Sequence, residues 1–327
     1  MPKSADAPPK GVAHELAALR AAFAGMVPAR TPDNLVIGTW NVRAFDRFTP
    51  KWRSTVGDSP IRDRSDVACL AEIVRCFDVI AIQEVRQSAQ AFLAVLSLLG
   101  PDWAYLVTDV TKGQAGNNER LAFVFDTTRV RPSGLACELV VAADATGEGT
   151  TPLHAEQFAR TPYAISFARG SALFTLVTLH VVYGKAPADR IAELTGIAQW
   201  LDRWAKQHDV WGGNLIALGD FNIDRVGDPL YQAFTSTGLR PPAPLNLVPR
   251  TVFDDPDPAA APDHRHFYDQ IAWFGGDTTS DALAGMQYRN AGMVDFVDRG
   301  IPAKDLTQLS WRISDHFPLW CEFGIVQ

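Results

Sequence analysis

Short apolar runs of strand length recur along this chain, and between them lie longer segments whose apolar residues are spaced as on one face of a helix. The runs predict strands at 35–39, 79–83, 103–107, 121–125, 164–167, 174–179, 215–218, 268–274 and 319–323. Helical spacing predicts helices at 12–26, 66–76, 89–99 and 191–204. Because the two kinds of element alternate, we expect an α/β fold in which helices cover the faces of β-sheets.

The run at 215–218 ends in polar groups. It breaks at Gly219 and continues as Asp220, Phe221 and Asn222, so a buried strand delivers a carboxylate and a carboxamide to its exposed end. A Gly-Asp pair followed by Asn is also ordinary turn chemistry, in which side chains bond their own backbone. The hypothesis of a functional site therefore depends on matching groups at other strand ends.

Five further apolar runs carry polar groups at one end. These groups are Asn41, Glu84, His180, Asp269 and the adjacent pair Asp315 and His316. Together they supply metal ligands and proton-transfer groups. Each also has a structural alternative: a turn residue for Asn41, a helix cap for Glu84 and a buried imidazole for His180.

The composition describes a globular protein with a sizeable core. The chain has 327 residues, of which 47% are hydrophobic and 20% charged. The motifs spread over nearly all of it, which favours one catalytic domain at 31–327. Residues 1–30 are interpreted as an N-terminal extension, disordered over its Pro- and Ala-rich start and then helical, with the helix laid on the domain.

The net charge of −7 argues against a broadly basic surface that coats nucleic acid. It does not exclude a nuclease, because clustered acidic ligands account for part of the excess and bound metal reverses the local field. The four cysteines show no CxxC spacing and predict reduced thiols. No apolar stretch approaches the length of a membrane span or a signal peptide core, so we expect a soluble cytoplasmic protein.

Three loops carry features of their own. The loop at 43–64 is rich in Arg and Lys, and it is either simply solvated or placed to steer a phosphate backbone. The irregular loop at 241–266 contains His264 and His266, which lack further ligands and are expected to be solvated. The segment at 283–300 is interpreted as an insertion near the mouth of the site, with no assigned role.

The polar groups at the strand ends favour hard cations. Carboxylates at Glu84, Asp220 and Asp315 and amides at Asn41 and Asn222 select Mg²⁺, Mn²⁺ or Ca²⁺ over zinc. This chemistry predicts metal-assisted hydrolysis of a phosphate ester by direct attack of water. It needs no Cys, Ser or Tyr nucleophile, so we expect no covalent intermediate.

From residue 35 to its end, the chain resembles the endonuclease/exonuclease/phosphatase superfamily, and in particular its deoxyribonuclease I-like members. The shared motifs, in the expected order, are IQEVR, ERLAFVF, Arg160-x-Pro162, a His after a sheet strand, GDFN, YDQI and SDHFP. The resemblance implies a four-layer α/β sandwich, with two mixed β-sheets packed face to face and helices outside.

The resemblance also implies roles for the site residues. The implied metal ligands are Glu84, Asp315, Asn41 and Asp220; the implied substrate contacts are Arg86, Asn41 and Asn222; the implied catalytic residues are His180, His316, Asp220, Asn222, Glu119 and Asp269. His316 with Asp269 would activate or orient the water, and His180 with Glu119 would protonate the leaving oxygen. In the exonuclease III branch the aspartate matching Asp220 is often given the role of base, so the proton acceptor stays open.

The predicted activity is that of a divalent-metal-dependent DNA endonuclease. The alternative is a phosphatase or phosphodiesterase for a lipid or inositol phosphate, because this scaffold serves several substrates. It is favoured by the acidic net charge and by Asn117, which stands where deoxyribonuclease I has a groove-filling tyrosine. A binding module without catalysis is disfavoured because every acid, amide and histidine is present.

Overall fold

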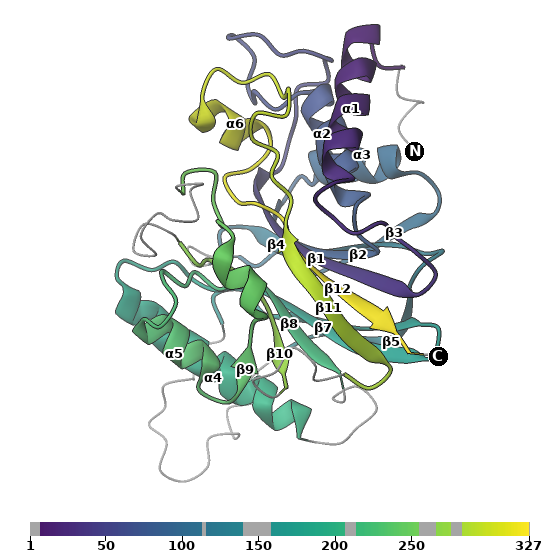
Figure 1. Ribbon diagram of the computed structural model, residues 1–327. Coiled ribbons are helices and arrows are strands. Elements are labelled where there is room, and N and C mark those ends of the chain that lie inside the picture. Colours follow the sequence, from purple (N-terminus) through teal and green to yellow (C-terminus); the bar gives the residue numbers. More distant parts are fainter. Residues whose placement is uncertain are drawn as a thin grey trace.

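Two β-sheets form the centre of the molecule (Figure 1). The computed structural model describes residues 7–112, 116–139, 158–206, 214–254, 266–275 and 283–326. The first sheet contains, in spatial order, β11 (Met286–Met293), β12 (Leu319–Ile325), β1 (Asn34–Phe45), β2 (Val79–Arg86), β4 (Glu119–Asp126) and β3 (Trp103–Val107). The second contains β5 (Arg131–Glu138), β6 (Tyr163–Arg169), β7 (Ala172–His180), β8 (Leu215–Asp220), β10 (Asp269–Phe274) and β9 (Leu239–Arg240).

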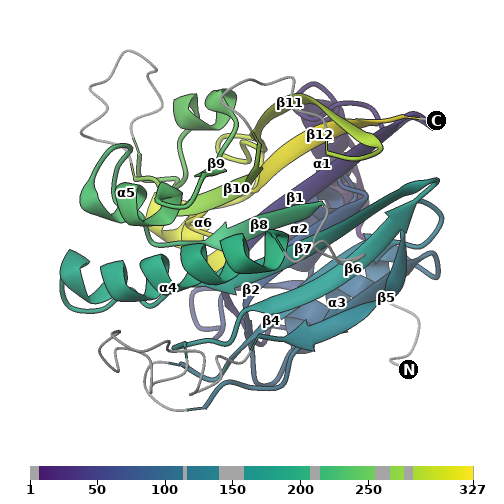
Figure 2. The same ribbon diagram turned by 90° about the horizontal axis from the view of Figure 1, so that it is seen from below.

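The sheets pack face to face, and helices cover their outer faces (Figures 1 and 2). On the first sheet lie α1 (Lys10–Phe23), α2 (Arg64–Val74) and α3 (Gln90–Leu99); on the second lie α4 (Pro187–Ala205) and α5 (Pro229–Thr235). The short elements η1 (Ala243–Leu247) and α6 (Leu306–Arg312) lie in connecting segments. Both sheets mix parallel and antiparallel pairs, so the predicted four-layer sandwich is confirmed.

The core between the sheets is built from strand residues of both layers. Ile37 and Phe123 of the first sheet pack in one cluster with Phe167, Leu218 and Ile271 of the second. Each of these side chains is fully buried. Because apolar burial is the main favourable term in folding, this layer fixes how the two sheets face each other.

The N-terminal helix packs on the domain as expected. Val12, Leu16, Leu19 and Phe23 are buried in the cluster that joins the helices to the first sheet. Arg20 also forms a bidentate ion pair with Glu72 of α2, at 2.5 and 2.7 Å. This helix is therefore part of the outer layer of the sandwich.

Two predicted strand boundaries are wrong. β1 runs past Asn41 to Phe45, and β2 runs past Glu84 to Arg86, so neither residue ends its strand. Instead, the pairing register shifts after Asn41 in β1 and between Ile82 and Val85 in β2. Asn41 follows the regular inward alternation of Leu35 and Ile37, whereas Glu84 lies within an irregular stretch, where a bulge can re-aim its side chain.

The segment at 283–300 is not simply an insertion. Its first half forms β11, which pairs with β12 and is the edge strand of the first sheet. The buried positions of β11 are broken by exposed polar residues, so no clear apolar run marks it. Edge strands need to bury only part of one face, which explains why the sequence pattern missed this one.

All four cysteines are free thiols, with Cys69 and Cys321 buried and Cys76 and Cys137 half-buried. Within the described ranges, no helix combines the length and apolar character needed to cross a bilayer.

Candidate active site

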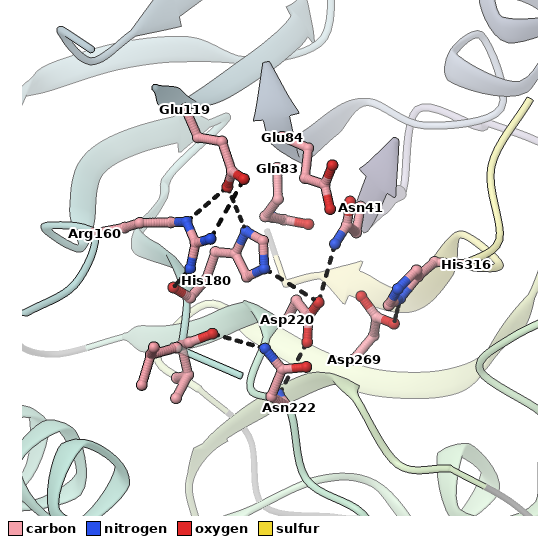
Figure 3. Close-up of polar contacts among 12 residues, drawn as sticks. Asn41, Gln83, Glu84, Glu119, Arg160, His180, Asp220, Asn222, Asp269 and His316 are labelled. Carbon is pink, nitrogen blue, oxygen red and sulfur yellow. Dashed lines mark hydrogen bonds and ion pairs between the residues drawn. The ribbon is translucent and has the colours of Figure 1, made fainter. Parts of the chain in front are cut away.

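Asp220 lies at the centre of a polar cluster at one end of both sheets (Figure 3). In the parallel pair of β7 and β8, Asp220 is in register with His180, and in the antiparallel pair of β8 and β10 it is in register with Asp269. Gly219 makes the close approach possible, because a Cβ at this position would lie 2.1 Å from the Leu179 carbonyl oxygen and its φ is +143°. The register thus brings three predicted site residues together.

Asn41 reaches this cluster from the opposite sheet. Its Nδ2 donates a hydrogen bond of 3.0 Å to Asp220 Oδ2, which links β1 of the first sheet to β8 of the second. Its Oδ1 is buried and has no hydrogen-bond partner. An acceptor buried without a partner is costly, so this oxygen is available to a cation or to a donor on a ligand.

The first histidine pair is His180 with Glu119. His180 Nδ1 lies 2.8 Å from Glu119 Oε2, and its Nε2 lies 3.5 Å from Asp220 Oδ2. Burial disfavours the charged form of Glu119, but the hydrogen bond from His180 and the charges of Arg160 and Arg86 outweigh it and lower its pKa to about 2. Glu119 therefore stays ionised and fixes the ring of His180.

Three groups hold Glu119 in place. Arg160 Nε lies 2.6 Å from Oε2, and Arg86 Nη2 lies 3.3 Å from Oε1. Asn117 donates its amide to Oε1 at 2.7 Å. Asn117 is thus part of the support of the His180 pair. Arg86 also bonds Glu84, so its guanidinium lies between two carboxylates.

The second histidine pair is His316 with Asp269. Their Nδ1 and Oδ2 atoms lie 2.6 Å apart. Burial disfavours a charged imidazole, but the negative charge of Asp269 and its neighbours outweighs this and raises the pKa of His316 to about 10. Burial raises the pKa of Asp269 to about 6 despite the opposing charge of His316. At neutral pH, without a cation, the pair therefore holds a proton on His316.

The cluster around Asp220 fits a divalent cation. Asp220, Asp269 and His316 each offer one ligand atom, and these atoms lie within 4.8 Å of one another. Asp269 Oδ1 is buried without a partner, and Asn41 Oδ1, also without a partner, adds a further oxygen that can bind a hard cation. Oxygen-rich sites of this kind suit Mg²⁺, Mn²⁺ or Ca²⁺.

Two of the predicted ligands lie beside this cluster and make other contacts. Glu84, at a φ of +61°, accepts the Ala44 backbone N–H at 2.8 Å. Asp315 forms an ion pair of 3.2 Å with Arg43. Figure 3 shows the Glu84 carboxylate close to Asn41, on the side of the cluster away from Asn222. Metal binding by Glu84 and Asp315 stays a prediction.

Asn222 braces the loop that follows β8. Its Nδ2 donates to the Val181 carbonyl at 2.7 Å, and its backbone N–H donates to Asp220 Oδ1 at 2.9 Å. Arg190, on the buried face of α4, donates to the Asn222 carbonyl at 2.6 Å and pairs with Asp224. The sequence analysis did not identify Arg190. Its position in line with the apolar face of the helix is the signal that could have identified it as buried.

Gln83 is a second residue that the sequence did not reveal. Its amide donates to Thr39 at 3.1 Å and to Thr178 at 2.9 Å, which ties β2 to β1 and to β7 of the other sheet. It is fully buried directly behind the site. A glutamine at the end of an apolar run gave no specific signal.

The basic loop at 43–64 is largely committed to the fold. Arg62 is buried and donates to four backbone carbonyls, and Arg53 pairs with Glu15 of α1. Lys51 pairs with Asp58. Arg43, which stacks on Trp311 and pairs with Asp315, lies nearest to the site. Fewer side chains of this loop are therefore available to contact a phosphate backbone than the composition suggested.

Comparisons with known proteins agree with this geometry. The sequence profile of the Endonuclease/Exonuclease/phosphatase family matches residues 38–316. A deoxyribonuclease of Thioalkalivibrio sp. (strain K90mix) is 26% identical over 312 residues, covering 91% of this chain and 73% of that protein. Deoxyribonuclease-1 of Bos taurus is 26% identical over 296 residues, covering 88% of this chain and 91% of that protein. A mannosyl-6-phosphatase of Bacteroides thetaiotaomicron has a TM-score of 0.55 at 17% identity, covering 89% of this chain and 100% of that chain.

Proposed function

The chain belongs to the endonuclease/exonuclease/phosphatase family, and we propose that it is a divalent-metal-dependent endonuclease that hydrolyses DNA by direct attack of water. One observation carries the proposal: Asp220 lies between two histidine–carboxylate pairs, one from each side. In such an arrangement, one histidine–carboxylate pair can act on the attacking water and the other on the leaving oxygen. The carboxylate of Asp220 lies between them, where the phosphate would bind.

The His180 pair suits the leaving group. With Nδ1 paired with Glu119, Nε2, which lies 3.5 Å from Asp220 Oδ2, is the nitrogen that faces the site and can give a proton to the departing oxygen. Glu119 stays ionised because its pKa is lowered to about 2, so it holds the ring in one orientation throughout the reaction. A positioned acid of this kind typically contributes on the order of 10²–10⁴-fold to the rate.

Two groups are available for the proton of the attacking water, His316 and Asp220. The raised pKa of His316 means that, without a cation, this ring already carries a proton and can orient the water but not deprotonate it. It accepts a proton only when positive charge balances Asp220, Asp269 and Asp315 around it.

A bound divalent cation supplies positive charge that neutralises the phosphate oxygens and lowers the barrier to forming an alkoxide. Asp220, Asp269 and the free oxygen of Asn41 would hold it, with Glu84 and Asp315 as the further predicted ligands.

DNA is the preferred substrate because the two relatives at 26% identity carry the name deoxyribonuclease and are matched over most of their length. A phosphatase or phosphodiesterase for a small or lipid substrate is the alternative. Two observations favour that alternative: the net charge of −7, and the use of Asn117 to hold Glu119 where deoxyribonuclease I has a groove-filling tyrosine.

A substrate panel tests the proposal. Plasmid DNA, single-stranded DNA, RNA, sphingomyelin, inositol polyphosphates and a nitrophenyl phosphodiester are each incubated with Mg²⁺ or with EDTA. We expect nicking and linearisation of the plasmid with Mg²⁺ and none with EDTA. Turnover of a lipid or inositol phosphate with the plasmid left intact would show that the alternative is correct.

A further inference from the structure

A third histidine–carboxylate pair lies outside the site described above. His266 Nδ1 lies 2.9 Å from Asp254 Oδ1, the same arrangement by which His180 meets Glu119 and His316 meets Asp269. The sequence pattern predicted a solvated ring at His266, and its side chain is indeed 47% exposed, but one ring nitrogen is bonded to a buried carboxylate that the pattern did not reveal. His264, its neighbour in the same motif, lies outside the described residues.

The pair has a buried side and an exposed side. The carboxylate of Asp254 is fully buried and accepts the backbone N–H groups of Arg250, Thr251 and His266, which fix its position. The side chain of His266 is 47% exposed. Since Nδ1 is bonded to Asp254, Nε2 is the ring nitrogen left for an external partner.

His266 is connected to the catalytic cluster through stacked rings. It stacks on Tyr268 with a centroid separation of 4.7 Å and an interplanar angle of 27°. Tyr268 in turn packs against His316 at 5.7 Å. A row of three rings therefore runs from the second histidine pair of the site to the exposed imidazole. Double-stranded DNA carries one phosphate about every 3.4 Å of axis on each strand, so neighbouring phosphates lie within the span of this row.

We propose that His266 binds a phosphate that neighbours the scissile phosphate on a polynucleotide, so that the enzyme recognises a nucleic-acid chain rather than an isolated phosphodiester. This inference rests on the proposed nuclease function. The buried carboxylate of Asp254 holds the ring of His266 in one orientation, so that Nε2 is presented to a ligand outside the pair. His266 is thus a substrate-binding residue and takes no part in bond breaking.

A simpler role for the pair is to tie together the two ends of the loop between Asp254 and His266. That role accounts for Nδ1 but not for the exposed Nε2 or for the row of rings. Two variants separate the roles. His266→Asn keeps an amide donor that can reach Asp254 but lacks the outer nitrogen, and His266→Ala removes both. His14→Ala is the matched control, because His14 is an exposed histidine on α1, over the outer face of the first sheet.

The experiment measures KM and kcat on a duplex oligonucleotide and on a nitrophenyl phosphodiester, with Mg²⁺, over a range of salt concentrations. We expect both His266 variants to raise KM for the duplex about tenfold, the size of one charge-assisted hydrogen bond. The slope of log KM against log salt should fall by about one unit, because one phosphate contact is lost. Constants for the small diester, and all constants of His14→Ala, should match those of the wild type.

Two outcomes would overturn the inference. If His266→Asn keeps the wild-type KM and salt slope while His266→Ala loses stability, the pair only ties the loop. Equal losses on both substrates would place His266 in the chemistry instead. The proposed function fails separately: a wild type that hydrolyses the small diester but neither binds nor cleaves DNA would remove both the nuclease assignment and this role for His266.

Discussion

His180 Nε2 lies 3.5 Å from Asp220 Oδ2, and the two residues face each other across the parallel strands β7 and β8. The same carboxylate oxygen accepts the amide of Asn41 from the other sheet. A proton donor and an amide from different layers thus converge on one oxygen. The arrangement of these groups around Asp220 Oδ2 determines several properties that can be measured.

His180→Ala should slow DNA cleavage by about 10²–10⁴-fold, because the charge on the departing 3′ oxygen must then develop without a proton donor. The loss should be clearly smaller on a nitrophenyl phosphodiester, whose leaving oxygen is already stable as an anion. Comparison of kcat on the two substrates checks this. Glu119→Gln serves as the graded control, since it keeps the ring but removes its charged partner. Equal losses on both substrates would place His180 at the water or the phosphoryl group.

Removal of metal should abolish turnover. EDTA should stop cleavage of every substrate, and Mg²⁺ or Mn²⁺ should restore it. Asp220→Asn and Glu84→Ala should each weaken Mg²⁺ binding in calorimetry, because each removes a negatively charged oxygen. Asp202→Asn is the matched control and should leave Mg²⁺ affinity unchanged, because Asp202 lies near the C-terminal end of α4 and pairs with Lys206. Unchanged affinity in Glu84→Ala would limit that carboxylate to its observed bonds with Ala44 and Arg86.

Gly219→Ala should destabilise the protein by several kcal/mol, on the order of 3 or more, because the new Cβ meets a backbone carbonyl and the residue keeps a positive φ. The clash with Leu179 would push β8 away from β7 and separate Asp220 from His180. The urea concentration at the midpoint of unfolding and kcat should therefore both be lower than in the wild type. Gly11→Ala is the control: no atom lies within 4 Å of its Cβ position in α1, and the change should slightly stabilise the helix.

The buried Glu119 predicts a specific dependence of stability on pH. Its folded-state pKa of about 2 lies below the ordinary value of 4.5, so its contribution is present above pH 4.5 and is lost as the pH falls through 2. Glu119→Gln cannot titrate. The Tm difference between the wild type and this variant should therefore be largest above pH 4.5 and shrink towards pH 2. A difference that stays constant over this range would mean that Glu119 is not preferentially ionised in the folded state.

Much of the fold was readable from the sequence because buried strands leave strong signals. β2 and β8 bury every apolar residue, and β7 does so from Phe174 onward, so their patterns were unambiguous. β5 and β11 were missed because both lie at sheet edges: β5 has no fully buried position, and the buried positions of β11 are interrupted by exposed ones. The order of strands in each sheet depends on contacts between distant segments, which no local pattern encodes.

The sequence predicted which residue types form the site, but not which contacts those residues make. Asp220, Asp269 and His316 meet as expected, since strand ends share one edge of the sandwich. The irregular pairing around Glu84, between Ile82 and Val85, leaves no mark in the sequence. The sequence also could not distinguish an arginine that meets substrate from one such as Arg62, which is buried against carbonyl groups.

The position of β12 has a consequence for the cell. It lies between β11 and β1 in the first sheet, and Asp315 and His316 immediately precede it. β1 is synthesised early, but its neighbour β12 can pair with it only after the chain has been translated past Ile325. A chain that ends before Asp315 therefore lacks both the second histidine pair and the strand that joins β11 to β1. We expect a product truncated at this point to be inactive.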